Sequence, residues 1–357
     1  MRAIRAGESG EKVRDVQSRL IALGQTIDPS ELEASHFGAS TERAVRAFQQ
    51  ERSLLVDAIV GPATWEELVE ASYSLGDRLL YLRAPNLRGD DVRALQERLD
   101  ILGFDPGRAD GIFGEQTDRA VRDFQRNVGL EPDGIVGATT LEALRRLRPP
   151  GAGPGRTAVR EGETLRSRGS LAGRTIALDA GHGPGDPGAR GPAGLTEAEA
   201  ALTLVEEVAD QVRASGATPV LLRNPQDDPT TEERVDRARR SGADALVSIH
   251  LNSHRDGSAE GASCYYFGRL GNVSVPGRAL AEMVQDELTS RLGLQDGRTH
   301  PKAYPLLRET PMPAVQVEPC FITNPKEEAA IQEAPFRQEV GRAVTAALAR
   351  FFEGRAD

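Results

Sequence analysis

Four side chains in the C-terminal half of the sequence could together activate a water molecule. Three of them, His182, Glu197 and His250, come from separate segments of the chain. Two imidazoles and one carboxylate match a catalytic Zn²⁺ site, in which three protein ligands leave a fourth position open for water. A further carboxylate must accept the proton of that water, and Glu318 is the candidate. The sequence therefore predicts a hydrolytic site with Zn²⁺ as its cofactor.

Each of these residues also has a simpler interpretation. A histidine in a Gly-His-Gly turn, such as His182, is more often a surface residue, and His250 follows an apolar run, where a core histidine is common. A glutamate at a helix start favours the helix dipole. Glu199 can form a capping box with Thr196, which leaves Glu197 free to point into a site. The zinc hypothesis depends on the order of these residues along the chain rather than on any one of them.

Strands alternate with helices around these residues. Short apolar runs predict strands at 175–178, 218–222, 243–249, 262–267 and 314–317, and helical spacing predicts helices at 197–214, 231–240, 276–292 and 336–352. Strands separated by helices form a mostly parallel sheet that helices cover on both faces. Reactive groups in such an α/β domain gather at the carboxyl ends of the strands, which is where His182, His250 and Glu318 fall.

The N-terminal part of the sequence contains an internal repeat. Residues 13–24 match residues 92–103, and residues 37–68 match residues 113–144, with a short insertion in the first copy. Within each copy the apolar residues recur every three or four positions, which indicates amphipathic helices. We therefore expect each copy to be a small three-helix module.

These patterns divide the chain into several domains. The boundaries that we predict are 1–73 and 84–148 for the two modules, 149–173 for a linker and 174–357 for the α/β domain. The linker begins with a run of proline and glycine that cannot hold a helix. We expect the whole linker to be extended or mobile.

The repeat resembles the peptidoglycan-binding domain of the PG_binding_1 type. The second copy carries nearly all of its pattern, with Val-x-x-Leu-Gln at 92–96, Asp-Gly-x-Phe-Gly at 110–114 and Asp-Gly-Ile-Val-Gly at 133–137. The first copy departs from the pattern, because no Asp-Gly precedes Phe37 and Ala58 replaces a glycine. Most of the matched positions are core or turn residues. The resemblance implies peptidoglycan or muropeptides as partners.

Residues 174–353 resemble the zinc-dependent N-acetylmuramoyl-L-alanine amidases of the Amidase_3 type. The matching motifs are Ile-Ala-Leu-Asp-Ala-Gly-His-Gly at 176–183, Gly-Leu-Thr-Glu at 194–197, Ser-Ile-His-Leu-Asn at 248–252 and Val-Glu-x-x-Phe-Ile-Thr-Asn-Pro at 317–325. The resemblance implies that His182, Glu197 and His250 hold zinc and that Glu318 is the catalytic carboxylate. It also implies hydrolysis of the amide between N-acetylmuramic acid and L-alanine in peptidoglycan, aided by the N-terminal modules.

Other residues near these motifs carry further expectations. Asn252 and Arg308 lie in matched segments and are predicted to bind substrate. Cys320 stands where the family usually has glycine, and its side chain beside Glu318 could crowd the site. The two remaining histidines of this half, His254 and His300, are expected to be exposed.

Composition limits the partners and the location. The 357 residues carry a formal net charge of −10, which disfavours nucleic acid and anionic membranes because both would be repelled. Two cysteines form no disulfide framework, no apolar stretch is long enough to span a bilayer, and the N-terminus lacks an ordinary secretory signal. We expect a cytoplasmic protein, with the cell envelope as the alternative if export follows a non-classical route.

The architecture has a second interpretation. Two binding modules, a Pro/Gly-rich linker and this α/β domain also resemble an actinobacterial group of cytoplasmic amidase-like proteins. That resemblance implies a regulator that binds an enzyme of peptidoglycan-precursor synthesis. The lack of an ordinary secretory signal and the negative net charge favour a regulator. The complete set of three zinc ligands, together with Glu318, favours an enzyme.

Overall fold

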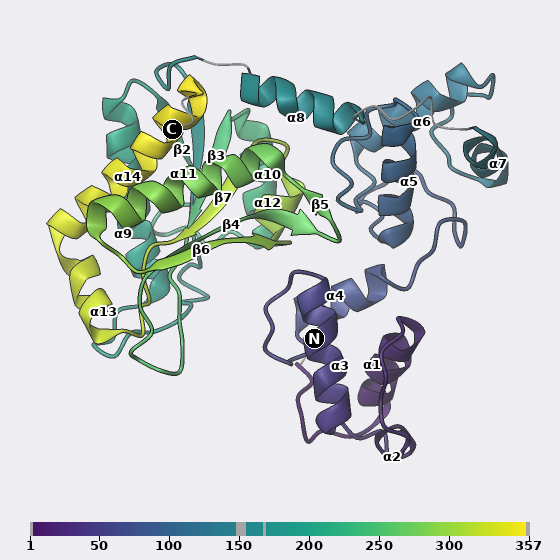
Figure 1. Ribbon diagram of the computed structural model, residues 1–357, viewed down its shortest axis with the longest axis horizontal. Coiled ribbons are helices and arrows are strands. Elements are labelled where there is room, and N and C mark those ends of the chain that lie inside the picture. Colours follow the sequence, from purple (N-terminus) through teal and green to yellow (C-terminus); the bar gives the residue numbers. More distant parts are fainter. Residues whose placement is uncertain (1–2, 148–154, 167–168, 355–357) are drawn as a thin grey trace. The chain divides into compact units, whose positions relative to one another are not determined.

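The computed structural model describes residues 3–147, 155–166 and 169–354. The chain forms two compact units, one of residues 1–160 with 269–272 and the other of residues 161–268 with 273–357. Figure 1 shows helices in the N-terminal part and a sheet with helices in the C-terminal part.

The first unit contains two copies of a helical module. The helices are α1 (Glu11–Ala22), α2 (Pro29–Glu33), α3 (Ala39–Glu51) and α4 (Pro62–Glu70) in the first copy, and α5 (Asp90–Ile101), α6 (Glu115–Asn127) and α7 (Ala138–Arg146) in the second. Each copy has its own hydrophobic core, which includes Val16 and Phe48 in one and Leu95 and Phe124 in the other. The predicted three-helix arrangement is present, and the insertion in the first copy forms α2.

The residues that repeat between the copies maintain the fold of the module. In each copy, two buried glutamines donate from Nε2 to a threonine hydroxyl near the start of a later helix. These pairs are Gln17–Thr41 (2.9 Å), Gln49–Thr64 (3.1 Å), Gln96–Thr117 (3.1 Å) and Gln125–Thr140 (3.2 Å). Buried polar groups need such partners. The repeated Gln and Thr positions therefore join the three helices that the two modules share.

The first copy differs from the second at the two places where it departs from the pattern. Glu31 of α2 accepts hydrogen bonds from the backbone N–H groups of Ser40 and Thr41 at the start of α3, both at 2.9 Å. Burial raises the pKa of Glu31, but these bonds outweigh it and lower the pKa to about 2. Ala58 adopts φ 62°, where the matching Gly134 has φ 74°. An alanine thus occupies a left-handed position that glycine adopts more easily.

The second module begins earlier than predicted. Leu80 is fully buried in the core of this module, and its backbone forms an isolated bridge with Val136. The module therefore includes residues before the expected boundary at 84. The sequence did not indicate that this segment belongs to the module, because its apolar residues show no helical spacing. These residues are Leu79, Leu80, Tyr81 and Leu82.

The expectation of an extended linker was wrong for part of it. Helix α8 (Arg156–Arg166) begins directly after the run of proline and glycine, while residues 149–154 lie outside the part of the chain that the structure describes. The Asp100 carboxylate accepts the backbone N–H of Thr157 at 2.7 Å. A carboxylate at this position satisfies a free N–H group and favours the helix dipole.

The second unit is built on a seven-stranded sheet. Its strands are β1 (Thr175–Ala180), β2 (Thr218–Leu221), β3 (Ala245–Ile249), β4 (Ala262–Arg269), β5 (Asn272–Val273), β6 (Asp296–Lys302) and β7 (Ala314–Glu318). They follow the order β2-β1-β3-β7-β4-β5, with β6 paired to β4. The pairs β1–β2, β1–β3, β3–β7 and β4–β6 are parallel and β4–β7 is antiparallel. The predicted mostly parallel sheet is confirmed.

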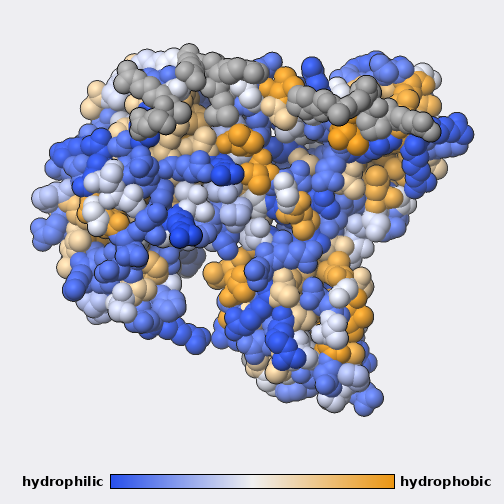
Figure 2. Space-filling model, viewed as in Figure 1, coloured by the Kyte–Doolittle hydropathy of each residue, from blue (hydrophilic) through white to orange (hydrophobic). Residues whose placement is uncertain are grey.

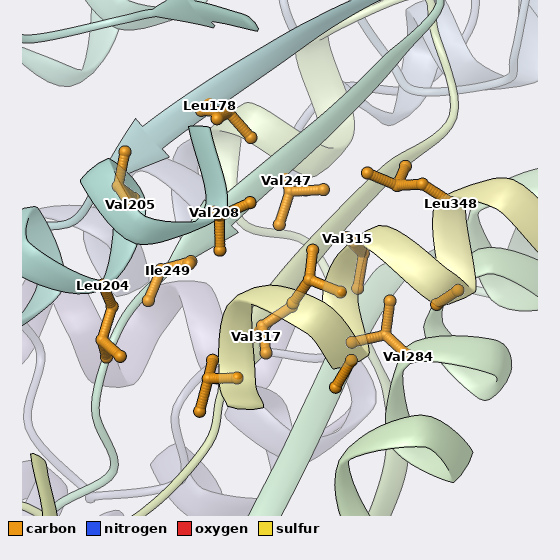
Figure 3. Packing of buried hydrophobic residues seen from close by; sticks show 14 of the residues in the cluster. Leu178, Leu204, Val205, Val208, Val247, Ile249, Val284, Val315, Val317 and Leu348 are labelled. Carbon is orange, nitrogen blue, oxygen red and sulfur yellow. The ribbon is translucent and has the colours of Figure 1, made fainter. Parts of the chain in front are cut away.

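Helices cover both faces of this sheet. They are α9 (Glu197–Ala214), α10 (Thr231–Ser241), α11 (Val275–Leu292), α12 (Pro305–Glu309), α13 (Pro325–Gln332) and α14 (Ala334–Glu353). Residues alternate between faces, so that Val247 and Ile249 pack with α9, α11 and α14, whereas Leu246 packs with α10 and α12. Figure 3 shows the larger layer, with Val208 of α9 and Leu348 of α14 over the strands.

The surface agrees with the composition. On the face that Figure 2 shows, most residues are hydrophilic and the hydrophobic residues form small patches. Charged residues make up 27% of the chain. Among the described helices, none is both long enough and apolar enough to cross a membrane.

Candidate metal and catalytic site

The four predicted site residues gather at one edge of the sheet. Strand β1 ends two residues before His182, β3 ends directly before His250, and Glu318 is the last residue of β7. These three strands are parallel neighbours, so their carboxyl ends lie together. Glu197 is the first residue of α9 and approaches the same edge. Segments far apart in the sequence therefore deliver their side chains to one place.

The start of α9 directs Glu197 into the site. The Thr196 hydroxyl accepts the N–H of Glu199, and the Glu199 carboxylate accepts the N–H of Thr196, which completes the predicted capping box. The Glu199 side chain is thereby bound to the N-terminus of α9. Glu197 has no capping role, and its side chain is 7% exposed beside the two histidines.

The three predicted ligands converge. Their ligand atoms all lie within 4.8 Å of one another. Glu197 Oε1 lies 3.2 Å from His182 Nε2 and 3.0 Å from His250 Nδ1. Tetrahedral zinc with bonds of about 2.0–2.2 Å separates its ligand atoms by about 3.3 Å. The two separations that involve Glu197, and the donor set of two nitrogens and one oxygen, therefore fit Zn²⁺, whose tetrahedral coordination would leave a fourth position for water.

Neighbouring groups orient these ligands. The Asp186 carboxylate lies 2.8 Å from Nδ1 of His182 and so directs Nε2 toward Glu197. The backbone N–H groups of Leu251 and Ala189 donate to Oε1 and Oε2 of Glu197 at 3.1 and 3.0 Å. A carboxylate behind a ligating histidine is common in metal sites, where it sets the ring orientation. Sequence reasoning gave Asp186 no role, although its position four residues after His182 was a signal.

Two glycines leave the space that the rings need. A Cβ on Gly181 would lie 2.4 Å from Cε1 of His250, and one on Gly188 would lie 2.7 Å from Cδ2 of His182. Gly188 also has φ 67°, which disfavours any other residue there. The glycines of these loops therefore permit close packing of the ligand side chains.

The pKa values reflect the proximity of these groups. Burial raises the pKa of Glu197, but hydrogen bonds from His182 and His250 outweigh it and hold the pKa well below its ordinary value. Burial lowers the pKa of His182, yet the carboxylates of Glu197 and Asp186 raise it to about 9. The site thus concentrates negative charge where a divalent cation would lie.

A buried arginine holds the loop that carries His182. The Arg234 guanidinium donates to the Asp179 carboxylate at 2.7 Å and to the backbone carbonyls of Ala180 and His182. The Ser248 hydroxyl donates to the other oxygen of Asp179 at 2.7 Å. His182 itself has φ 61°, a left-handed conformation that is costly for residues other than glycine. Arg234 therefore stabilises a strained backbone that aims a ligand.

Replacing Arg234 by Met is expected to destabilise the second unit by about 3–5 kcal/mol, because it leaves the Asp179 carboxylate buried without its charge partner. Thermal unfolding followed by circular dichroism measures the effect, together with the zinc content of the variant. Arg240→Met is the matched control, since Arg240 lies on the same helix and is exposed. Equal melting temperatures for the two variants would contradict the prediction.

Glu318 is buried beside polar side chains at the end of β7. It is 9% exposed, and burial raises its pKa above the ordinary value, against the opposing influence of His250. The Gln316 amide and the Tyr265 hydroxyl donate to its two oxygens at 3.0 and 3.1 Å. Sequence reasoning assigned neither donor. The spacing of Gln316, two residues before Glu318 on one strand, placed both on one face and could have indicated it.

Comparisons with known proteins identify the families of both parts of the chain. Residues 176–350 match the family described as N-acetylmuramoyl-L-alanine amidase, and residues 9–68 and 88–144 match a putative peptidoglycan binding domain. CwlM of Mycobacterium tuberculosis, an N-acetylmuramoyl-L-alanine amidase by name, is 40% identical over 98% of this chain and 89% of its own. This chain belongs to the N-acetylmuramoyl-L-alanine amidase family. Both resemblances predicted from the sequence are confirmed.

Other members of the amidase family are similar to about half of the chain. LytC of Bacillus subtilis is 34% identical over 49% of this chain and 34% of its own length. The solved structure of AmiC2 from Nostoc punctiforme is 26% identical with a TM-score of 0.47, and covers 51% of this chain and 99% of that protein. An amidase structure from Clostridium difficile 630 is 26% identical with a TM-score of 0.49, covering 52% and 100%.

The remaining predicted residues of the amidase domain differ in their burial. The Asn252 side-chain oxygen accepts the N–H of Ser253 at 2.9 Å, and Arg308 is 6% exposed. Their role in substrate binding stays a prediction. Cys320 is fully buried among the core residues. His254 and His300 are exposed, as expected.

Proposed function

We propose that this chain is a zinc-dependent amidase that hydrolyses the amide between N-acetylmuramic acid and L-alanine in peptidoglycan. Membership of the amidase family and the two peptidoglycan-binding matches support action on peptidoglycan. The observation that carries the zinc requirement is the convergence of His182, Glu197 and His250 within 4.8 Å. Glu318 at the neighbouring strand end supplies the acid–base group.

The residues divide the reaction between them. His182, Glu197 and His250 would hold the ion, and Zn²⁺ in that position supplies Lewis acidity for the scissile carbonyl and for water. Glu318 accepts a proton from the attacking water while the water oxygen forms a bond to the carbonyl carbon of the lactyl group. The same carboxyl then protonates the alanine nitrogen as the C–N bond breaks. The products are a free lactyl carboxylate and a stem peptide with a free amino terminus.

A turnover assay tests the proposal directly. Purified full-length protein with measured zinc content is incubated with defined muropeptides, and the products are identified by mass spectrometry. Release of a peptide that begins with L-alanine is the expected result. Zinc-loaded protein that cleaves none of the muropeptides, or that cleaves them at another bond, would contradict the proposal.

The pH dependence follows from the burial of Glu318. The base must be ionised to accept a proton, and burial raises its pKa above the ordinary value of 4.5. Activity is therefore expected to fall as the pH decreases through this raised pKa, so that the acidic limb of kcat/KM lies above pH 4.5. The measurement is kcat/KM against pH at constant zinc occupancy. A limb at or below pH 4.5 would contradict the prediction.

The regulator that the sequence also suggested remains the second candidate. The formal charge of −10 favours a protein partner over anionic polymers. In this alternative the chain is cytoplasmic and binds a peptidoglycan-precursor enzyme. Cell fractionation with a pull-down tests it: recovery of the chain in the wall fraction alone, with no such enzyme bound, would exclude the regulator.

A further inference from the structure

The environment of Glu318 suggests a role for two residues that the proposed reaction has not used. Glu318 ends β7, and Gln316 precedes it by two positions on the same face of that strand. Val315 and Val317 face the opposite side, where they join the hydrophobic core. Tyr265 lies on β4, directly opposite Gln316 in the antiparallel pair.

This register places Tyr265 diagonally across from Glu318, since Ser263 is its direct partner. Diagonal neighbours are about 7–8 Å apart, within reach of a long aromatic side chain. The Tyr265 hydroxyl accordingly donates to Oε2 of Glu318 at 3.1 Å, and Nε2 of Gln316 donates to Oε1 at 3.0 Å. Each oxygen of the Glu318 carboxylate therefore accepts a hydrogen bond from a different side chain.

We propose that Gln316 and Tyr265 are positioning residues that fix the Glu318 carboxylate in one orientation for proton transfer. The inference rests on the proposed function, because it assigns these residues to the base of that reaction. An ionised carboxylate accepts about four hydrogen bonds, two on each oxygen. One donor on each oxygen thus fixes the plane of the group and leaves a lone pair available to take the proton from water.

Both donors keep their protons in this environment. Burial raises the pKa of Tyr265, and the nearby Glu318 charge raises it further, so the phenol stays protonated and donates. The Gln316 amide does not titrate. Hydrogen bonds donated to a carboxylate favour its ionised form, which opposes the effect of burial on Glu318. Removing either donor should therefore move the acidic limb of the activity profile to higher pH.

Several other groups act on Glu318 and must be considered in such a profile. These are His250 after β3, Glu197 of α9, Tyr304 before α12, Lys302 of β6 and Cys264 of β4. All of these residues remain in the variants, and phenylalanine at position 265 keeps the ring that lies 5.8 Å from the ring of Tyr304. Differences between the variants and the wild type therefore report the loss of the donors.

The experiment compares Gln316→Met, Tyr265→Phe and the double variant in the full chain. Each single variant is expected to lower kcat about 10-fold, with KM, melting temperature and zinc content near the wild-type values. The double variant should be slower than either one. Tyr266→Phe and Gln285→Met are controls, because Tyr266 belongs to the core on the other face of β4 and Gln285 holds the Ala262 carbonyl. Both controls should keep kcat.

A second readout does not depend on turnover. Carbon-13 NMR of glutamate-labelled protein follows the protonation of Glu318, whose signal is assigned by its loss in Glu318→Gln. Its midpoint should rise in Gln316→Met and in Tyr265→Phe. If the wild type is inert yet the midpoints rise, the reaction fails and the positioning role stands. Unchanged midpoints, or wild-type kcat in all three variants of an active enzyme, would overturn the inference.

Discussion

Replacing Glu318 by Gln is expected to lower kcat for muropeptide hydrolysis by about 1000-fold, because an amide of the same size cannot accept a proton from water. The side chain is 9% exposed, so the substitution also removes a buried carboxylate rather than adding a buried charge. Stability and zinc content should therefore change little. Steady-state kinetics on a defined muropeptide, with metal analysis of each preparation, measure the effect.

Glu327→Gln is the matched control for this prediction. Burial raises the pKa of Glu327 as well, but its oxygens accept the backbone N–H groups of Gly261 and Phe321. This variant should keep kcat near that of the wild type and affect stability instead. If Glu318→Gln kept the kcat of the control, Glu318 would not be the base, and the mechanism proposed here would be wrong.

Replacing Glu197 by Gln is expected to abolish zinc binding and activity together. The carboxylate contacts both histidines at 3.0–3.2 Å, and a neutral amide oxygen is a much weaker ligand. Changes in the groups behind the ligands alone cost about 10–100-fold in metal affinity, so loss of a ligand should cost more than about 100-fold. Competition with a chromophoric chelator measures the affinity.

Glu199→Gln is the control that distinguishes binding of the metal by Glu197 from capping of α9 by Glu199. Glutamine also completes a capping box, so this variant should retain the start of α9, the zinc and the activity. Chelation of the wild type should remove activity, and added Zn²⁺ should restore it. Unchanged zinc affinity in Glu197→Gln would show that the three side chains do not share an ion.

Much of the fold followed from local patterns in the sequence. Apolar runs at 175–178 and 314–317 predicted strands, because these strands are buried on both faces. Helical spacing predicted the bounds of α9, because a helix buries one stripe of its surface. The short insertion in the first copy was identified from the sequence, but the helix α2 that it helps to form was not predicted, and neither was the strand β6. No residue of the segment Asp296–Lys302 is fully buried. Its sequence therefore lacks the alternating apolar residues that indicate a strand.

The site shows the same division. The chain order of His182, Glu197, His250 and Glu318 indicated the metal chemistry, and the capping box distinguished Glu197 from Glu199. Only the tertiary structure decided which groups support them. Arg234 reaches the His182 loop from α10, and Tyr265 reaches Glu318 from the neighbouring strand. Such contacts depend on the register and packing of segments that are far apart in the sequence. Register and packing determine the distance between two side chains, and the spacing of residues along the chain does not indicate that distance.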